Sequence, residues 1–251
     1  MSKPLKATVN CDMGEGFSLY TMGDDEGLMK TIHLANIACG FHASDFSVMN
    51  KTVALAKSNN VLVGAHPSLP DLQGFGRREM AIEPESCFIY QVGALDGFLK
   101  RYGLPMNHIK PHGSVYGQTA RSIDPRTGSS SAAGPQGVAF MGLAGTAHQQ
   151  ATEELGVPFI AEWFADLDYN DEGKLLITKK HDPVPIEVVR QRVKNLLKLH
   201  KVSTVGGKLL DIGANVTEVS ICCHSDTPGA VEIAQAVKAL VDESNREAGY
   251  V

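Results

Sequence analysis

The sequence predicts an α/β fold in which seven strands and their connecting helices form a (β/α) barrel. Its length of 251 residues is typical of one such barrel. Short apolar runs alternate with longer segments of helical period from end to end, which is a βα pattern. A continuous βα series with right-handed crossovers closes most naturally into a barrel, and a doubly wound open sheet is the alternative. We therefore expect a single barrel domain over residues 1–251.

The strands and helices are predicted from the two kinds of apolar pattern. The short apolar runs that predict strands are Leu5–Asn10, Leu34–Cys39, Val61–Ala65, Asn107–Lys110, Val138–Leu143, Pro158–Phe164 and Val219–Cys223. The segments of helical period are Asp24–His33, Ser47–Asn59, Pro84–Tyr102, Thr146–Gly156, Ile186–His200 and Pro228–Ser244. Two of these helices begin with proline, which is well tolerated in a first turn.

Two segments depart from the βα pattern. Ala120–Gly137 is rich in Gly, Ser and Pro and cannot supply an apolar helical face, so we expect a flexible loop in place of the fourth helix. Asp168–Asp182 contains the turn sequence Asn170–Gly173 followed by Lys174–Thr178. This order predicts a short hairpin that projects beyond the barrel.

Composition excludes several classes of protein. The net charge is −5 and no basic run is longer than Lys179-Lys180, which argues against a nucleic-acid partner. No stretch approaches the ~18 apolar residues of a membrane span, and the first residues lack the apolar region of a signal peptide. The five cysteines are an odd number and include the neighbours Cys222 and Cys223, so reduced thiols are expected. We expect a cytoplasmic protein with no membrane partner.

Polar residues gather where the predicted strands end, which is where barrel enzymes hold their reacting groups. These residues are Asn10, Asp12 and Glu15 after the first strand, His42 and Asp45 after the second, His66 after the third, Lys110 and His112 after the fourth, Asp166 after the sixth, and His224 and Asp226 after the seventh. Four of the nine histidines are among them. Independent structural histidines would have no reason to converge on one rim.

Each of these residues also has a structural interpretation. A single histidine is more often hydrogen-bonded within a fold than bound to a ligand, and Asp45 or Asp226 could cap the helix that follows. The remaining histidines are interpreted as structural or solvated; they are His33, His108, His148, His181 and His200. The case for a functional site therefore depends on the joint occurrence of the rim residues.

A rim of carboxylates, imidazoles and one lysine suits hydrolysis. Asp and His can hold a divalent cation that activates water, or can act directly as general base and acid, and spacing does not decide between the two. Lys110 could neutralise a carboxylate or an oxyanion. The glycine-rich stretch Asp71–Arg78 is a candidate substrate loop in which an arginine grips a carboxylate, or else a plain connecting turn. Neither standard nucleotide-binding glycine loop is present.

The same residues carry a resemblance to the lactam-utilisation (LamB/YcsF) family, which includes the A subunit of bacterial ATP-dependent 5-oxoprolinase. The matching blocks are Asn10–Glu15, Ala35–Asp45, Gly64–Arg77, Gln91–Leu95, Lys110–Gly113, Gly142–Gly145 and Glu162–Asp166. The resemblance implies a seven-stranded barrel like that of the glycoside hydrolase and deacetylase barrels, a cytosolic setting, and ATP-driven opening of 5-oxo-L-proline to L-glutamate. It also implies two partner subunits, B and C, that handle the ATP.

Site residues follow from the rim and the resemblance together. The predicted catalytic residues are Asp12, Glu15, Lys110 and His112, and the predicted substrate contacts are Asn10, Asp45, Arg77 and His224. By analogy with the metal-dependent deacetylases, Asp12, His42 and His66 are the candidate ligands of a divalent metal.

The chain departs from the family pattern at three positions. Leu167 and Gly117 stand where the family usually has Arg and Asn, and Ser225 stands where it usually has Gly. The substrate could therefore be a related small lactam. Two other hypotheses remain open, namely a stand-alone metal-dependent amidohydrolase or deacetylase, and a non-catalytic subunit that binds the lactam for a partner.

Overall fold

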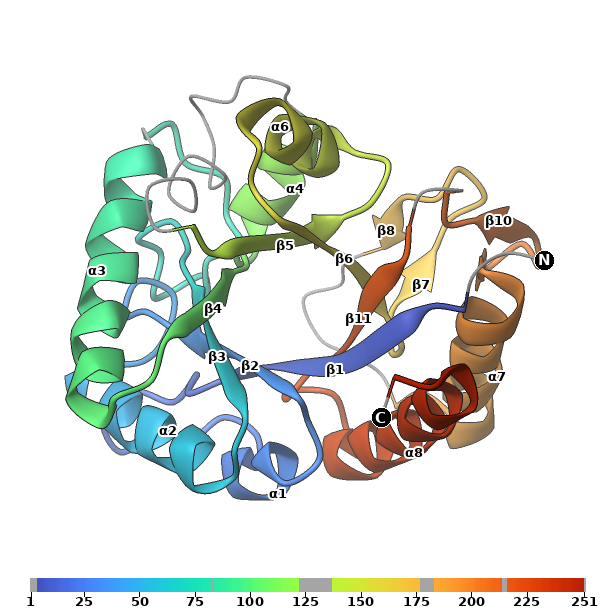
Figure 1. Ribbon diagram of the computed structural model, residues 1–251. Helices are drawn as coiled ribbons and strands as arrows, with labels where there is room; N and C mark the ends of the chain where they lie inside the picture. Colours follow the sequence, from blue (N-terminus) through green and yellow to red (C-terminus); the bar gives the residue numbers. More distant parts are fainter. Residues whose placement is uncertain (1–3, 83, 122–136, 177–182, 214–215, 251) are drawn as a thin grey trace.

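Seven parallel strands form a closed barrel in the computed structural model, which describes residues 4–82, 84–121, 137–176, 183–213 and 216–250 (Figure 1). The barrel strands are β1 (Lys6–Met13), β2 (Leu34–Ala38), β3 (Leu62–His66), β4 (Met106–Ile109), β5 (Ala139–Leu143), β6 (Phe159–Phe164) and β11 (Glu218–Cys223). They follow chain order around the barrel, and β11 closes it by pairing with β1. The predicted fold class is confirmed.

Helices surround the barrel on its outside (Figure 1). They are α1 (Asp25–Met29), α2 (Phe46–Ser58), α3 (Pro84–Tyr102), α4 (Ser114–Arg121), α6 (Ala147–Leu155), α7 (Ile186–Lys194) with its π-helical continuation η3 (Asn195–Leu199), and α8 (Ala230–Ala248). Asp24, Asp45 and Thr146 each accept backbone N–H groups at a helix start. These caps explain where α1, α2 and α6 begin. None of the helices in the described ranges is long and apolar enough to cross a membrane.

The fourth connection corrects one prediction. A short helix, α4, follows β4 and includes Ala120 and Arg121, which the sequence pattern places in a loop instead of a fourth helix. Its buried face comes from Val115, Tyr116 and Thr119. These three residues lie before the Gly/Ser/Pro-rich segment, so the composition of that segment gave no sign of the helix. The rest of the predicted loop, residues 122–136, lies outside the described residues.

Two small hairpins accompany the barrel. The predicted one is present as β7 (Asp168–Tyr169) paired antiparallel with β8 (Leu175–Leu176), and Asn170 accepts backbone N–H groups within its turn. Residues 177 and 178 of its predicted second strand lie outside the described residues. A second hairpin, β9 (Lys201–Ser203) and β10 (Leu209–Asp211), was not predicted from the sequence.

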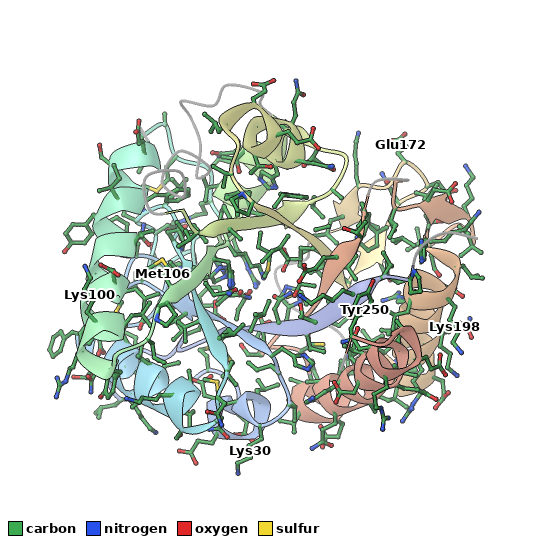
Figure 2. All side chains as sticks on the ribbon, in the orientation of Figure 1. Lys30, Lys100, Met106, Glu172, Lys198 and Tyr250 are labelled. Carbon is green, nitrogen blue, oxygen red and sulfur yellow. The ribbon has the colours of Figure 1, made fainter. Side chains whose placement is uncertain are left out.

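The inside of the barrel is polar, and the apolar core lies between the strands and the helices. Figure 2 shows nitrogen and oxygen atoms gathered in the middle of the barrel. Inward-facing Asn36 donates to Asn10, its Oδ1 lies 2.6 Å from His108 Nε2, and all three side chains are fully buried. The outer core is formed by residues such as Val9, Ile37, Val53, Leu95, Ile221 and Val237. These hydrogen-bonded side chains lie inside the barrel, beneath its mouth, which is the opening at the carboxyl ends of the strands.

Candidate active site

A buried lysine and two carboxylates form the centre of the site. Lys110, directly after β4, places its Nζ 2.8 Å from Asp12 Oδ1 on β1 and 2.9 Å from Glu162 Oε1 on β6. Burial alone would lower the pKa of Lys110, but Asp12 and the other nearby acids raise it well above its ordinary value. Burial alone would likewise raise the pKa of Asp12, but the charges of His66 and Lys110 hold it well below its ordinary value. Both groups are therefore charged at neutral pH.

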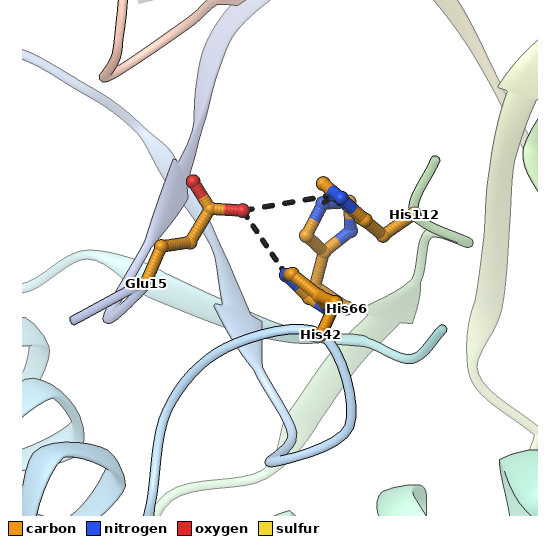
Figure 3. A group of neighbouring side chains, drawn as sticks. All are labelled: Glu15, His42, His66 and His112. Atoms are coloured by element: carbon orange, nitrogen blue, oxygen red, sulfur yellow. Dashed lines mark hydrogen bonds and ion pairs between the residues drawn. The ribbon is translucent and has the colours of Figure 1, made fainter. Parts of the chain in front are cut away.

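Three histidines and Glu15 form an adjoining cluster (Figure 3). Glu15 follows β1, His42 follows β2, His66 ends β3 and His112 follows β4. Glu15 Oε1 lies 3.1 Å from His42 Nε2 and 3.6 Å from His112 Nδ1, and the His42 and His112 rings stack with centroids 3.7 Å apart. All four side chains are buried.

Backbone carbonyls determine which imidazole nitrogens carry protons. His66 Nδ1 donates to Lys110 O at 2.8 Å, and His112 Nε2 donates to Phe75 O at 2.9 Å. In the neutral rings the other nitrogens, His66 Nε2 and His112 Nδ1, then carry lone pairs, yet they lie 2.9 Å apart. Two facing lone pairs need a proton or a cation between them. His66 Nε2 also lies 3.2 Å from Asp12 Oδ2, so the Asp12 carboxylate would balance the positive charge of that proton or cation.

This cluster fits a divalent metal by its donor set. One donor atom from each of Glu15, His42, His66 and His112 lies within 4.8 Å of the others. Three imidazoles with a carboxylate are donors that zinc and related metals accept. The Nδ1 atom of His42 is buried without a hydrogen-bond partner in the described part of the chain. The predicted ligands were Asp12, His42 and His66. The geometry groups His42 and His66 with Glu15 and His112, while Asp12 belongs to a second group of possible ligands with Cys222 and His224 and is paired with Lys110.

Glu15 and His224 complete the ionisable groups of the site. Burial raises the pKa of Glu15, whose Oε2 accepts a hydrogen bond from Ser225 at 3.3 Å. His224 Nδ1 donates to Asp166 Oδ1 at 2.9 Å. Burial alone would lower the pKa of His224, but the Asp166 carboxylate raises it to about 9. Arg77 NH2 lies 3.2 Å from Asp226 Oδ2 across the rim.

A small pocket of about 60 Å³ opens onto these groups. Its ionisable lining residues are Asp12, His66, Arg77, Lys110, His112, Tyr116 and His224. A larger hollow of about 340 Å³ lies between the β1–α1 loop and α2, but its lining contains none of the rim histidines. The smaller pocket is the candidate active site because the perturbed acids and bases converge on it.

Two predicted substrate contacts lie elsewhere. Asn10 is fully buried in the barrel, where it donates to Ser220 and accepts from Asn36. Asp45 accepts the backbone N–H groups of Ser47 and Val48 and caps α2. Neither residue lines the pocket. Both side chains therefore have a role within the fold, and a contact of either one with substrate stays a prediction.

Sequence reasoning missed two residues of the site. Glu162 is fully buried on β6 and accepts a hydrogen bond from the Tyr116 hydroxyl at 2.7 Å. Tyr116 lies on α4, the helix that was not predicted. The signal for Glu162 was present, since a carboxylate inside an apolar strand requires a buried partner.

Fold and site together define a class of protein, a seven-stranded (β/α) barrel with buried acids, histidines and a lysine at its mouth. The model of the LamB/YcsF family matches residues 7–250. The chain therefore belongs to the LamB/YcsF family, as the sequence blocks indicated.

Three relatives illustrate this membership. The chain is 45% identical over 248 residues to the lactam utilization protein lamB of Emericella nidulans, with 98% of each chain covered. It is 41% identical over 242 residues to the A subunit of 5-oxoprolinase from Staphylococcus epidermidis, covering 93% of this chain and 94% of the relative. The crystal structure of the lactam utilization protein from Thermus thermophilus superposes with a TM-score of 0.82 at 33% identity, with 98% of each chain covered. These similarities support a role in lactam utilisation.

Proposed function

We propose that this chain is the lactam-binding, amide-opening subunit of an ATP-dependent hydrolase of the 5-oxoprolinase type. Its substrate is 5-oxo-L-proline or a related small lactam, which is opened to the amino acid. The observation that carries the proposal is the convergence of Asp12, Lys110 and His66 on one small pocket. A lactam carbonyl entering that pocket would meet a cation, a base and a proton donor together.

Each group has a role that follows from its charge and its contacts. Lys110 is held as a cation by Asp12 and Glu162, so it can stabilise the oxyanion that forms when the amide carbonyl is attacked. His66, whose ring is oriented by the hydrogen bond from its Nδ1 to Lys110 O, can take a proton on Nε2 from the attacking water, and ionised Asp12, 3.2 Å from that nitrogen, then stabilises the imidazolium. Glu15 and His112, next to it, can return a proton to the leaving amine nitrogen.

Two cofactors belong to the proposal. A divalent metal held by Glu15, His42, His66 and His112 would take the place of the acid–base roles of His66, Glu15 and His112, since it would itself polarise the carbonyl or activate water. It is the feature that favours the second candidate, a stand-alone metal-dependent amidohydrolase. The similarity to the A subunit of a 5-oxoprolinase supports partner subunits. We propose in addition that these partners, B and C, use the ATP. We place the complex in the cytoplasm.

Ring opening by reconstituted mixtures tests the proposal. The purified chain is incubated with 5-oxo-L-proline, or with other small lactams, in the presence and absence of ATP and of candidate B and C partners. The new primary amine is measured. Turnover that needs ATP and the partners supports the proposal, whereas turnover by the chain alone that a chelator abolishes supports the amidohydrolase. No ring opening in any mixture would refute both.

A single exchange at His112 separates catalysis from passive binding. His112→Gln should abolish ring opening while lactam binding and partner binding survive, because the imidazole contacts site groups, namely His66, Glu15, the His42 ring and the Phe75 carbonyl, rather than the apolar core. A scaffold subunit that presents the lactam to a partner would keep its turnover in the same variant. Circular dichroism confirms that the variant is folded.

A further inference from the structure

We propose that the β1–α1 loop and the start of α2 form the surface on which the ATP-using partner subunits dock, and that the docking partner presents an apolar face with a lysine or arginine at its centre. The inference rests on the proposed function, because it assigns a place to the partners of that reaction. Three features of the described chain carry it, namely an exposed apolar patch, an acidic hollow beside the patch, and the closeness of both to the site.

Five large apolar side chains are exposed on this part of the surface. They are Phe17, Leu19, Tyr20, Met22 and Phe46, which we call the loop patch. Leu19 is 93% exposed, and Tyr20 and Phe46 are each 77% exposed. Single exposed apolar residues are normal on a protein surface, whereas a group of large ones marks an interaction surface.

The turn that carries most of the loop patch is held in one conformation. Two backbone hydrogen bonds of 2.9 Å between Phe17 and Tyr20 close it, with Leu19 near its tip. Asp45, the cap of α2, also accepts the N–H of Ser18 at 2.7 Å, so the turn lies beside the first residue of that helix, which is the fifth member of the patch. An apolar side chain on a fixed turn loses little conformational freedom on binding.

A hollow of about 340 Å³ lies beside the loop patch, between the loop and α2. Two side chains of the patch help to line it. Its charged lining residues are three acids and one cation, namely Asp24, Asp25, Glu26 and Lys51. Lys51 lies 3.5 Å from Glu26, which leaves a formal excess of two negative charges. A lysine or arginine, with an apolar stem and a charged head, complements this mixed lining.

The charge of the hollow favours a different chain over a second copy of this one. A two-fold symmetric dimer buries the same patch on both copies, so the two acidic hollows would meet in one interface. Like charges that face each other across an interface oppose association. The whole chain is also acidic, with a net charge of −5. A partner with a basic residue in an apolar face avoids this repulsion.

The loop patch lies close to Glu15 of the site. The N–H of Gly14, one residue before Glu15, donates to Asp25 Oδ2 at 3.1 Å, and Asp25 lines the hollow. Ser225 donates to Glu15, and a Cβ atom built on Gly23 of the loop would lie 2.9 Å from Ser225 Cβ. A partner on the loop patch would therefore sit next to the mouth of the barrel, where the use of ATP must be coupled to ring opening.

Association with the partner subunits tests this surface directly. Purified B and C subunits of a 5-oxoprolinase, the partners of the ring-opening test, are titrated into the full chain by calorimetry. Leu19→Glu and Phe46→Glu should each raise the dissociation constant at least about tenfold, because each places a charge in an apolar contact. Unchanged affinity in both variants would overturn the inference.

An exposed leucine at the other end of the barrel provides the matched control. Leu155 is 46% exposed at the end of α6, directly before β6, and so lies away from the mouth. Leu155→Glu should bind the partners as tightly as the wild type. An equal loss of affinity in Leu155→Glu and Leu19→Glu would contradict a specific role of the loop patch.

A second variant tests the charge of the hollow. In Asp25→Asn the side chain can still accept the N–H of Gly14, and burial already raises the pKa of Asp25 to about 6, so a neutral group should leave the chain folded. The variant should weaken partner binding and should reduce the loss of affinity that rising salt causes in the wild type. The same salt dependence in both proteins would contradict a basic partner residue in the hollow.

Turnover and oligomeric state distinguish docking from other roles of the loop patch. At a limiting concentration of partners Leu19→Glu should slow ATP-dependent ring opening, and a saturating concentration should restore the wild-type rate, because the variant leaves the pocket residues unchanged. Light scattering gives the mass of the chain alone. A wild-type dimer that Leu19→Glu dissociates would identify a second copy as the occupant and would overturn the inference.

The outcomes also separate this inference from the proposed function. If the loop-patch variants bind the partners like the wild type and the lactam is opened, the inference fails and the proposed function stands. If the variants lose the partners but no mixture opens a lactam, the inference stands and the proposed function fails. If the wild-type chain binds neither B nor C, both fail and only the stand-alone amidohydrolase is left.

Discussion

At the scale of single residues, Lys110 is the side chain on which the site depends most. Its removal leaves Asp12 and Glu162 as buried carboxylates without their shared cation. Lys110→Met should therefore lower the free energy of unfolding by about 3–5 kcal/mol and reduce lactam opening by about a hundredfold or more, as expected for a lost oxyanion donor. Chemical denaturation and turnover measure the two effects.

A second exchange separates the structural effect from the catalytic one. In Lys110→Met/Glu162→Gln one of the two stranded charges is neutralised, and the glutamine can still accept the hydrogen bond of Tyr116. The double variant should regain part of the lost stability but none of the activity. Recovery of turnover together with stability would show that Lys110 is structural.

His224 makes stability depend on pH in a definite direction. Burial alone would lower its pKa, but Asp166 raises it to about 9 in the folded chain, against about 6.5 when unfolded, so folding binds a proton between these values. The stabilisation of about 3 kcal/mol is complete below pH 6.5 and is lost as the pH rises through 9. The stability difference between wild type and His224→Gln should therefore be large at about pH 6 and small at about pH 9.5. Parallel stability curves would contradict the pairing with Asp166.

At the scale of elements, the start of α2 shows how one side chain fixes a boundary. Asp45 accepts the N–H groups of Ser47 and Val48 and also that of Ser18 from the β1–α1 loop. Asp45→Ala should cost about 1 kcal/mol of stability, the effect of a lost N-cap, with the lactam dissociation constant unchanged. Thermal denaturation and calorimetry measure both quantities. A weaker lactam affinity at unchanged stability would restore Asp45 as a substrate contact.

The closeness of β3 to the buried His108 gives a second prediction at this scale. A Cβ atom built on Gly64 would overlap the His108 ring, which is fully buried and hydrogen-bonded to Asn36. Gly64→Ala should therefore destabilise the chain by about 1–3 kcal/mol. Gly93→Ala, in α3 where an added Cβ meets nothing, should instead stabilise it by up to about 1 kcal/mol. Similar effects at both glycines, measured by chemical denaturation, would show that the barrel interior can relax.

The sequence predicted the strands well because each is a short apolar run between turns, and the barrel follows from their number and order. It missed α4 because the buried face of that helix consists of Val115, Tyr116 and Thr119, too few residues to produce a visible period. Glu162 was missed because its partners Lys110 and Tyr116 are distant along the chain. Convergence of the rim histidines could be predicted, since parallel strands place their ends together, but the pairing of individual side chains depends on register.

At the scale of the whole molecule, barrel closure creates the site. The parallel register pairs Asp12 with Asn36 and Ala38 with His66. Pairing of β11 with β1 then brings Cys222 to within 3.3 Å of Lys110 Nζ, although the two residues are 112 positions apart in the chain. Because the groups come from strands on all sides, their charges can be matched only in the closed barrel. Folding and assembly of the site are therefore one event.

A divalent cation should for the same reason stabilise the entire chain rather than one loop. Its proposed ligands Glu15, His42, His66 and His112 follow or end four successive strands, so a bound ion would tie all four together. At a free concentration of about 100 times its dissociation constant, the ion should add about 2.7 kcal/mol to the free energy of unfolding. Elemental analysis of the purified chain, and melting temperatures with added zinc or with a chelator, measure this effect.

Two histidine variants provide the control. His42→Gln should lose the zinc response, whereas His200→Asn should keep it. The second exchange removes an imidazole after η3, at a left-handed backbone position that Asn tolerates. A melting temperature indifferent to zinc and chelator would assign the contact between His66 and His112 to a shared proton, and would leave direct acid–base catalysis by His66, Glu15 and His112 as the mechanism.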